Sequence, residues 1–192
     1  MAAQALVFVL EVFFGLFVFG FLLRFLMQAM RAPFRNPAGS AVIALTDWAV
    51  KPLRKVLPGW RGIDWASVVA VYLAQFLWLA ALHLALGTGF SLAGPLLPFL
   101  ALAAVIALLK AVLWLAIIVV FVQAILSWVA PDGPLAGVLN ALTFPLLRPV
   151  RRVVPPIGGT LDLSPLIVIV LAQLVLITIV PWLESSATRL FI

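Results

Sequence analysis

Four long apolar runs constrain the fold of this sequence more than any other feature. They cover residues 5–23 (continuing past Arg24 to residue 30), 68–86, about 96–129 and 166–183. A helix needs about 20 residues to cross the roughly 30 Å hydrocarbon layer of a bilayer, and it satisfies its backbone polar groups internally. The runs therefore predict an all-α membrane protein with four transmembrane helices.

The composition excludes soluble classes of protein. Of the 192 residues, 66% are hydrophobic and 9% are charged, whereas a soluble domain is about 45–50% apolar and about 25% charged. The net charge of +6 therefore indicates contact with a membrane surface rather than with nucleic acid. With no cysteine and one histidine, His83, the chain lacks the ligand sets and nucleophile–base pairs that metal sites and acyl transfer need. We expect no catalytic residue, metal or cofactor.

The basic residues are concentrated in two loops. Residues 31–64 and 130–164 hold nine of the twelve Lys and Arg residues, whereas the turn at 87–95 holds none. The positive-inside rule makes these two loops cytoplasmic, and both termini then face outward. The N-terminal run lacks a basic start and a cleavage site, so we interpret it as a retained span rather than a signal peptide.

The sequence contains an internal repeat. Residues 46–58 and 143–155 share the motif [Lys/Arg]-Pro-x-Arg-[Lys/Arg]-x-x-Pro at an offset of 97. Other matched polar residues keep an offset of 98 or 99, namely Asp64 and Asp162, Gln75 and Gln173, and Arg24 and Gln123. We predict two units, 1–90 and 91–192, each with a span, a basic loop and a span. An even number of spans per unit predicts parallel repeats, related by a pseudo-twofold axis along the membrane normal.

Each basic loop contains an amphipathic segment, at residues 39–50 and 135–147. Val42, Leu45 and Trp48 fall on one helical face of the first, opposite Asp47. These segments predict short helices at the inner leaflet. We expect both to end before the prolines that follow, with the diglycine Gly158-Gly159 after the second, and Pro145 to end or kink the second helix.

The repeated motif resembles that of a known family. Ser127-Trp128, the segment from Leu147 to Pro155, Gly158-Gly159 and the segment from Asp162 to Pro165 are similar to the signature of the YggT (YlmG-like) family of small membrane proteins. The first copy departs from it: Gln28-Ala29 replaces Ser-Trp, and Lys51 replaces the first Arg. The resemblance implies a bacterial inner-membrane protein, with roles in osmotic stress tolerance and potassium homeostasis or in cell division. Chloroplast members of this family are linked to haem attachment, so the resemblance also implies an assembly factor.

Six basic residues of the motif are candidate binding residues. They are Lys51, Arg54, Lys55, Arg148, Arg151 and Arg152. Such charges gain about 1 kcal/mol each near an anionic leaflet, which is consistent with topology determination and headgroup anchoring. The alternative is a docking site for a partner protein or a specific anionic lipid.

Several polar residues near or within the spans have predicted structural roles. Asp64 and Asp162 are expected at helix N-termini, in ion pairs with the upstream Arg cluster, or in both. Gln75 and Gln173 are expected to make interhelical hydrogen bonds, with an ion path as the alternative.

Two charged residues lie inside spans at matched depths. The offset of 99 places Glu11 opposite Lys110, and we predict that they form an intramembrane pair where the first and third spans meet. The alternative is that each side chain reaches the outer interface separately.

Taken together, these features favour a non-enzymatic membrane scaffold, assembly factor or envelope-homeostasis factor. Its expected partners are anionic membrane lipids and a membrane protein or further copies of the chain, and not nucleic acid. The alternative is a small potassium channel or transporter component in osmotic stress tolerance. The spans hold few large polar groups, too few to line a pore in a monomer.

Overall fold

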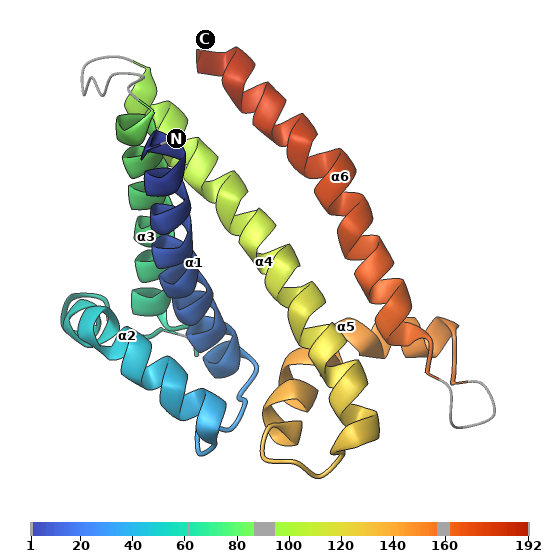
Figure 1. Ribbon diagram of the computed structural model, residues 1–192. Coiled ribbons are helices and arrows are strands. Elements are labelled where there is room, and N and C mark those ends of the chain that lie inside the picture. The colour runs from blue at the N-terminus through green and yellow to red at the C-terminus, as the bar shows by residue number, and fades with distance from the viewer. Residues whose placement is uncertain (1, 61, 87–94, 157–161, 192) are drawn as a thin grey trace.

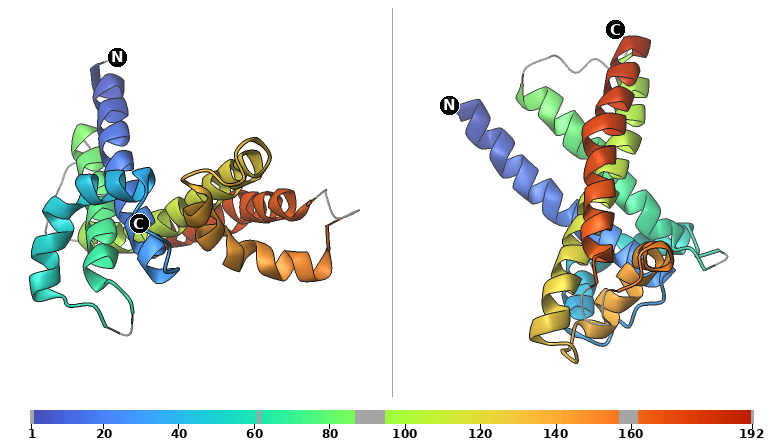
Figure 2. Two further views of the ribbon diagram at one scale, coloured as in Figure 1. Left: turned by 90° about the horizontal axis from the view of Figure 1, so that it is seen from below. Right: turned by 90° about the vertical axis from the view of Figure 1, so that its right-hand side faces the viewer.

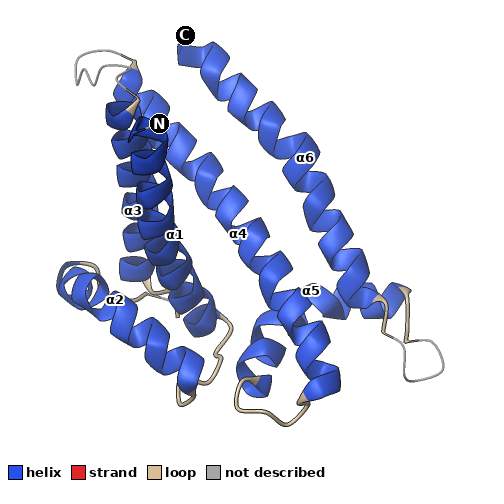
Figure 3. Cartoon of the chain, viewed as in Figure 1, coloured by secondary structure: helices blue, strands red, loops and turns tan. Residues whose placement is uncertain are grey.

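The computed structural model of this chain describes residues 2–60, 62–86, 95–156 and 162–191, in which all regular elements are α-helices (Figure 3). The six helices are α1 (Ala2–Ala29), α2 (Pro37–Val56), α3 (Trp65–Ala85), α4 (Leu96–Val129), α5 (Ala136–Val153) and α6 (Ser164–Phe191). The predicted all-helical class is therefore confirmed.

Four of these helices, α1, α3, α4 and α6, are long and apolar enough to cross a membrane. Each covers all or nearly all of one of the four predicted spans, and the bounds of α4 coincide with the predicted 96–129. The last helix continues to Phe191 through Pro181, well beyond the predicted end at 183. The chain is thus built as a multi-pass membrane protein.

The long helices pack in two pairs. Helix α1 packs mainly on α3 and helix α4 mainly on α6, while α3 and α4 join the two pairs. The largest cluster of buried apolar residues, which includes Phe21, Leu22, Val71 and Leu115, lies where α1, α3 and α4 meet. The chain termini lie at one end of the molecule, and α2 and α5 lie at the opposite end (Figures 1 and 2).

Local sequence fixes where α2 begins. The Asn36 side chain accepts a hydrogen bond from the backbone N–H of Gly39 at 2.9 Å, and Pro37 occupies the first helical position. Both are common start signals. A Cβ added at Gly39 would run into the carbonyl of Phe34, so only glycine fits this approach of the helix to the preceding chain.

The two short helices are longer than predicted, because the prolines do not end them. Helix α2 continues through Pro52, and α5 continues through Pro145 and Pro149. A proline inside a helix frees the carbonyl four residues earlier. All three prolines are themselves exposed. Residues 87–94 of the predicted turn at 87–95 and the diglycine Gly158-Gly159 lie outside the described residues.

Candidate functional site

The basic helix of the first half is fastened to α1 by a buried arginine. Arg24 of α1 donates hydrogen bonds to Thr46 at 2.7 Å and to Asp47 at 2.8 Å, both on α2. Asp47 also pairs with Lys51 at 2.7 Å. Hydrogen bonds from Lys51 and Arg24 hold the pKa of Asp47 below its ordinary value. Asp47 therefore points toward α1 rather than to the polar face predicted for it, because the buried Arg24 needs a counter-ion.

A second contact closes the α2–α3 connection. Arg54 pairs with Asp64 at 2.6 Å, and Ser67 donates a hydrogen bond to the same carboxylate at 2.5 Å. Asp64 is almost fully buried, with 1% of its side chain exposed. Burial alone would raise the pKa of Asp64, but the bonds from Arg54 and Ser67 outweigh this effect and lower it. We call this ion pair the first latch.

The same contact recurs in the second half. Arg151 at the end of α5 pairs with Asp162 at 2.7 Å, just before α6. Burial raises the pKa of Asp162, but hydrogen bonds from Ser164 and Arg151 prevail and lower it. The backbone N–H of Ser164 donates to Asp162 at 2.9 Å, so this aspartate both pairs with arginine and caps a helix. We call this ion pair the second latch.

The two halves differ in the remaining contacts of the motif. Lys51 is paired with Asp47, whereas its counterpart Arg148 lies over the ring of Phe144 at 5.6 Å from the centroid. Gln123, the counterpart of Arg24, donates to Asn140 at 2.7 Å. The second half thus replaces an ionic network with neutral and cation–π contacts, which leaves its basic residues less neutralised.

Three of the six candidate cations therefore remain available for an outside partner. Within the described residues, Lys55, Arg148 and Arg152 have no carboxylate partner, and all three are exposed. Lys51 is exposed but paired, and Arg54 and Arg151 are held by the latches. We refer to Lys55, Arg148 and Arg152 as the free cations.

The two glutamines at matched positions have different surroundings. Gln75 of α3 donates an interhelical hydrogen bond to the carbonyl of Ala107 in α4 at 3.1 Å, as predicted. Gln173 of α6 forms no hydrogen bond to another described residue. The reason is that α3 lies between α1 and α4, whereas α6 packs on α4 alone among the long helices.

Lys110 has a different ion-pair partner from the predicted Glu11. It pairs with Glu184 of α6 at 3.3 Å, and no ion pair joins it to Glu11 in the described part of the chain. Glu11 and Lys110 nevertheless line one cavity of about 350 Å³, together with Gln75 and Glu184. The repeat offset predicts that Glu11 and Lys110 lie at equal depth, but not which carboxylate pairs with Lys110. Glu184 is the partner because α4 packs more extensively on α6 than on α1.

Sequence reasoning missed two partners, Asp47 for Arg24 and Glu184 for Lys110. The need of a buried arginine for a counter-ion, together with the i,i+4 spacing of Asp47 and Lys51, could have indicated the first. Glu184 had no comparable signal, because it lies far along the chain from Lys110 and within five residues of the basic Arg189.

Four membrane-length helices, with two basic helices at one end, define a multi-pass α-helical membrane protein. The chain belongs to the CCB3/YggT family, whose model matches residues 3–85 and 102–183. This agrees with the resemblance of the repeated motif.

Relatives from bacteria span nearly the same length. The uncharacterized protein YggT of Escherichia coli K12 is 33% identical over 97% of this chain and 95% of its own length. An uncharacterized protein of Pseudomonas aeruginosa is 34% identical over 89% of this chain and 86% of its own. Neither name states an enzymatic activity. We found no matching solved structure.

Proposed function

We propose that this protein is a non-enzymatic scaffold or assembly factor of the bacterial inner membrane, with a role in envelope homeostasis. Its basic helices contact anionic lipid or a partner protein. The observation that carries this proposal is the division among the cations of the motif. The two latches pair Arg54 and Arg151 with aspartates of the fold, whereas the free cations are exposed and have no carboxylate partner among the described residues.

The proposal includes an arrangement in the membrane. Both termini face the periplasm, and α2 and α5 lie at the cytoplasmic interface as the interfacial helices of two repeat units, 1–90 and 91–192. The positive-inside rule supports this orientation, and the basic helices lie at the end opposite the termini (Figure 1). The two segments matched by the family model, 3–85 and 102–183, support the repeat.

A photo-crosslinking experiment in native membranes tests the binding surface. Phe144 lies beside Arg148 and is 54% exposed, so a photoreactive phenylalanine at this position samples the surroundings of the free cations. We expect adducts with a discrete membrane protein or with anionic phospholipid, identified by mass spectrometry. The double variant R148Q/R152Q should lose most of these adducts.

The matched control is K51Q, because Lys51 is already paired with Asp47. It should retain the adducts of the parent protein. Adducts that persist unchanged in R148Q/R152Q would show that the free cations do not recruit the partner, and the proposal would fail.

The cavity with Glu11, Gln75, Lys110 and Glu184 favours a second candidate, a small potassium channel or transporter component. Ionisable groups inside membrane-spanning helices often mark ion pathways. Liposomes that contain only this protein separate the two candidates. The scaffold proposal predicts no potassium flux above that of empty liposomes, whereas a flux abolished by E11Q would establish the alternative.

A further inference from the structure

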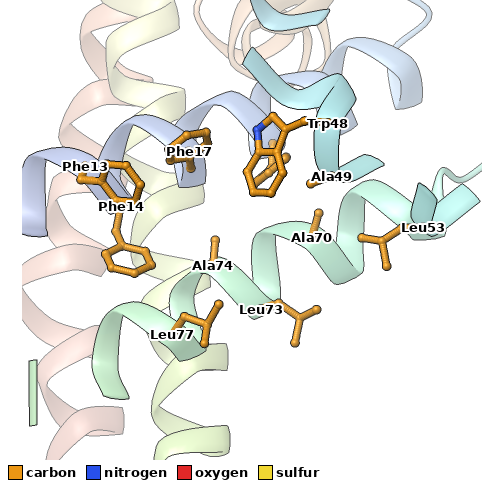
Figure 4. A pocket seen from close by; sticks show the side chains of 11 residues that line it. Phe13, Phe14, Phe17, Trp48, Ala49, Leu53, Ala70, Leu73, Ala74 and Leu77 are labelled. Atoms are coloured by element: carbon orange, nitrogen blue, oxygen red, sulfur yellow. The ribbon is translucent and has the colours of Figure 1, made fainter. Parts of the chain in front are cut away.

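An apolar groove lies between the first three helices. It has a volume of about 380 Å³ and is lined by side chains of α1, α2 and α3. Phe17, Trp48 and Leu73, one from each helix, border the same space (Figure 4). The rings of Phe17 and Trp48 meet edge to face at 5.5 Å between centroids. We call this space the first groove.

A second groove of about 580 Å³ lies between α4, α5 and α6. Apart from Pro149, its lining is made of aliphatic side chains, among them Leu113, Val150 and Leu171. Both grooves have the same construction, with two long helices as walls and a short basic helix across one end. We call this space the second groove.

The two grooves occupy matching places in the repeat. Phe14 and Phe17 of α1 correspond, at the offset of 99, to Leu113 and Ala116 of α4. Ala49 and Leu53 of α2 correspond, at 97, to Leu146 and Val150 of α5. At 98, residues 70, 73, 74 and 77 of α3 correspond to residues 168, 171, 172 and 175 of α6. All these residues line their grooves.

The paired residues differ in size and shape, as with Phe17 and Ala116. The groove therefore follows from the path of the chain in each half rather than from one set of side chains. A feature that both halves form with different residues is a property of the repeated unit.

The chemistry of the grooves identifies their ligand. They have few polar groups to hold water in place, and an α-helix of about 10–12 Å diameter is too wide to insert into volumes of this size. A flexible hydrocarbon chain fits both conditions. The short helix at the end of each groove presents apolar residues to the groove, such as Leu53 or Val150. The free cations are exposed and lie two residues along the same helices from these apolar residues.

We propose that each groove binds an acyl chain of an anionic phospholipid, whose phosphate is bound by the free cations of the adjoining short helix. This inference rests on the proposed function, because it assumes that the basic helices contact anionic lipid. The second groove has two free cations, Arg148 and Arg152, and the first has one, Lys55. The second groove is therefore the more selective for anionic headgroups.

Native mass spectrometry of the full chain, purified in detergent and supplied with phosphatidylglycerol or phosphatidylcholine, tests the proposal. The parent protein should retain two phosphatidylglycerol molecules. Filling one groove with L73W or L171W should reduce this number to one, and the double variant should retain none. R148Q/R152Q should abolish the preference of the second groove for phosphatidylglycerol while the groove still admits a chain.

The control variant is L174W, which lies three residues from Leu171 on α6. The exposed fractions of Leu171 and Leu174 are 52% and 48%, but only Leu171 lines a groove. L174W should retain both lipids, and circular dichroism should show equal helix content in all variants. Equal lipid retention by L171W and L174W would overturn the groove proposal.

The outcomes also separate this inference from the proposed function. If L171W retains both lipids but R148Q/R152Q loses its photo-crosslinks, the proposed function is supported and the proposal of lipid binding in the grooves is wrong. If L171W loses one lipid while R148Q/R152Q keeps its photo-crosslinks, the groove stands and the proposed role of the free cations in recruiting a partner fails.

Discussion

At the scale of the residue, Arg54 and Arg151 have matching positions in the repeat but hold carboxylates of unequal burial. The exposed fraction of the side chain is 1% for Asp64 and 26% for Asp162. A buried charge that loses its partner keeps its full desolvation cost, whereas an exposed charge is solvated by water. The first latch therefore contributes more to stability than the second.

We accordingly predict a larger stability loss for R54Q than for R151Q. R54Q should lower the free energy of unfolding by about 1–3 kcal/mol, and R151Q by no more than about 1 kcal/mol. Thermal unfolding in detergent micelles, followed by circular dichroism, measures both. R152Q is the control, since this exposed residue has no ion pair in the described chain, and it should unfold like the parent. Equal losses for R54Q and R151Q would contradict the difference in burial.

The latches also predict a dependence of stability on pH. The pKa values of Asp64 and Asp162 lie below those of ordinary aspartates, so the folded state binds these protons less readily than the unfolded state. Their contribution is fully present above the unfolded pKa of about 3.9 and is lost as the pH falls through the lowered values.

The melting temperature should therefore fall as the pH decreases from about 5 to below 3.9. The decrease should be smaller in the double variant D64N/D162N, which has no titrating carboxylate in either latch. A parent protein and a double variant with parallel melting curves across this range would show that the latches do not titrate as proposed.

The spacing within one motif was enough to suggest the latches, because Arg54 and Asp64, like Arg151 and Asp162, lie ten or eleven residues apart. The contact of Arg24 with Asp47 was not predicted, since it depends on how α2 lies against α1. The same applies to Lys110 and Glu184, which are 74 residues apart. Contacts of this kind follow from helix packing and cannot be derived from spacing.

At the scale of the element, the start of α2 depends on one glycine. A Cβ at Gly39 would collide with backbone atoms of Phe34, whereas a Cβ at Gly15 of α1 would meet nothing within 4 Å. Backbone atoms cannot move aside as a flexible side chain can. The two glycines are thus a matched pair for testing the approach of α2 to the preceding chain.

We predict that G39A lowers the melting temperature and that G15A leaves it equal or slightly higher. Alanine favours a helix interior over glycine by about 0.5–1 kcal/mol, and only at position 39 does a collision outweigh this gain. Thermal unfolding of the two variants in the same detergent measures the difference. A G39A variant as stable as G15A would show that the start of α2 can shift.

The elements themselves were largely predictable, for a physical reason. Hydrocarbon selects long apolar segments, so hydropathy locates spans such as 96–129. The extents of α2 and α5 were underestimated because proline was expected to end them. Pro52, Pro145 and Pro149 nevertheless lie inside their helices.

At the scale of the whole molecule, the orientation in the membrane can be tested with single cysteines, because the chain contains none. Asp132 is exposed in the connection between α4 and α5, and Thr188 is exposed near the end of α6. The proposed topology places these two positions on opposite sides of the membrane.

A membrane-impermeant maleimide applied to spheroplasts should label T188C at once. It should label D132C only after the membrane is disrupted. Labelling of both variants in disrupted membranes is the control for reactivity. The reverse pattern would invert the topology and place the basic helices outside.

The contact between the two helix pairs was expected where the first and third spans meet, but α3 and α4 make most of it. It uses a face of α3 whose counterpart on α6 has no helix against it, so Gln75 is bonded and Gln173 is not. The repeat therefore accounts for contacts within each half. The contact between the halves involves α3 but not its counterpart α6, so it does not follow the repeat.

The position of α2 and α5 at a single end of the molecule (Figure 1) has a mechanical consequence. If α2 and α5 lie at the membrane interface as proposed, the chain adds more cross-sectional area to one leaflet than to the other, whichever way it is inserted. Lipids around a protein of this wedge shape must tilt, or the bilayer must bend. The effects of many copies gathered together would add. The protein would then favour regions of matching curvature even without a specific receptor there.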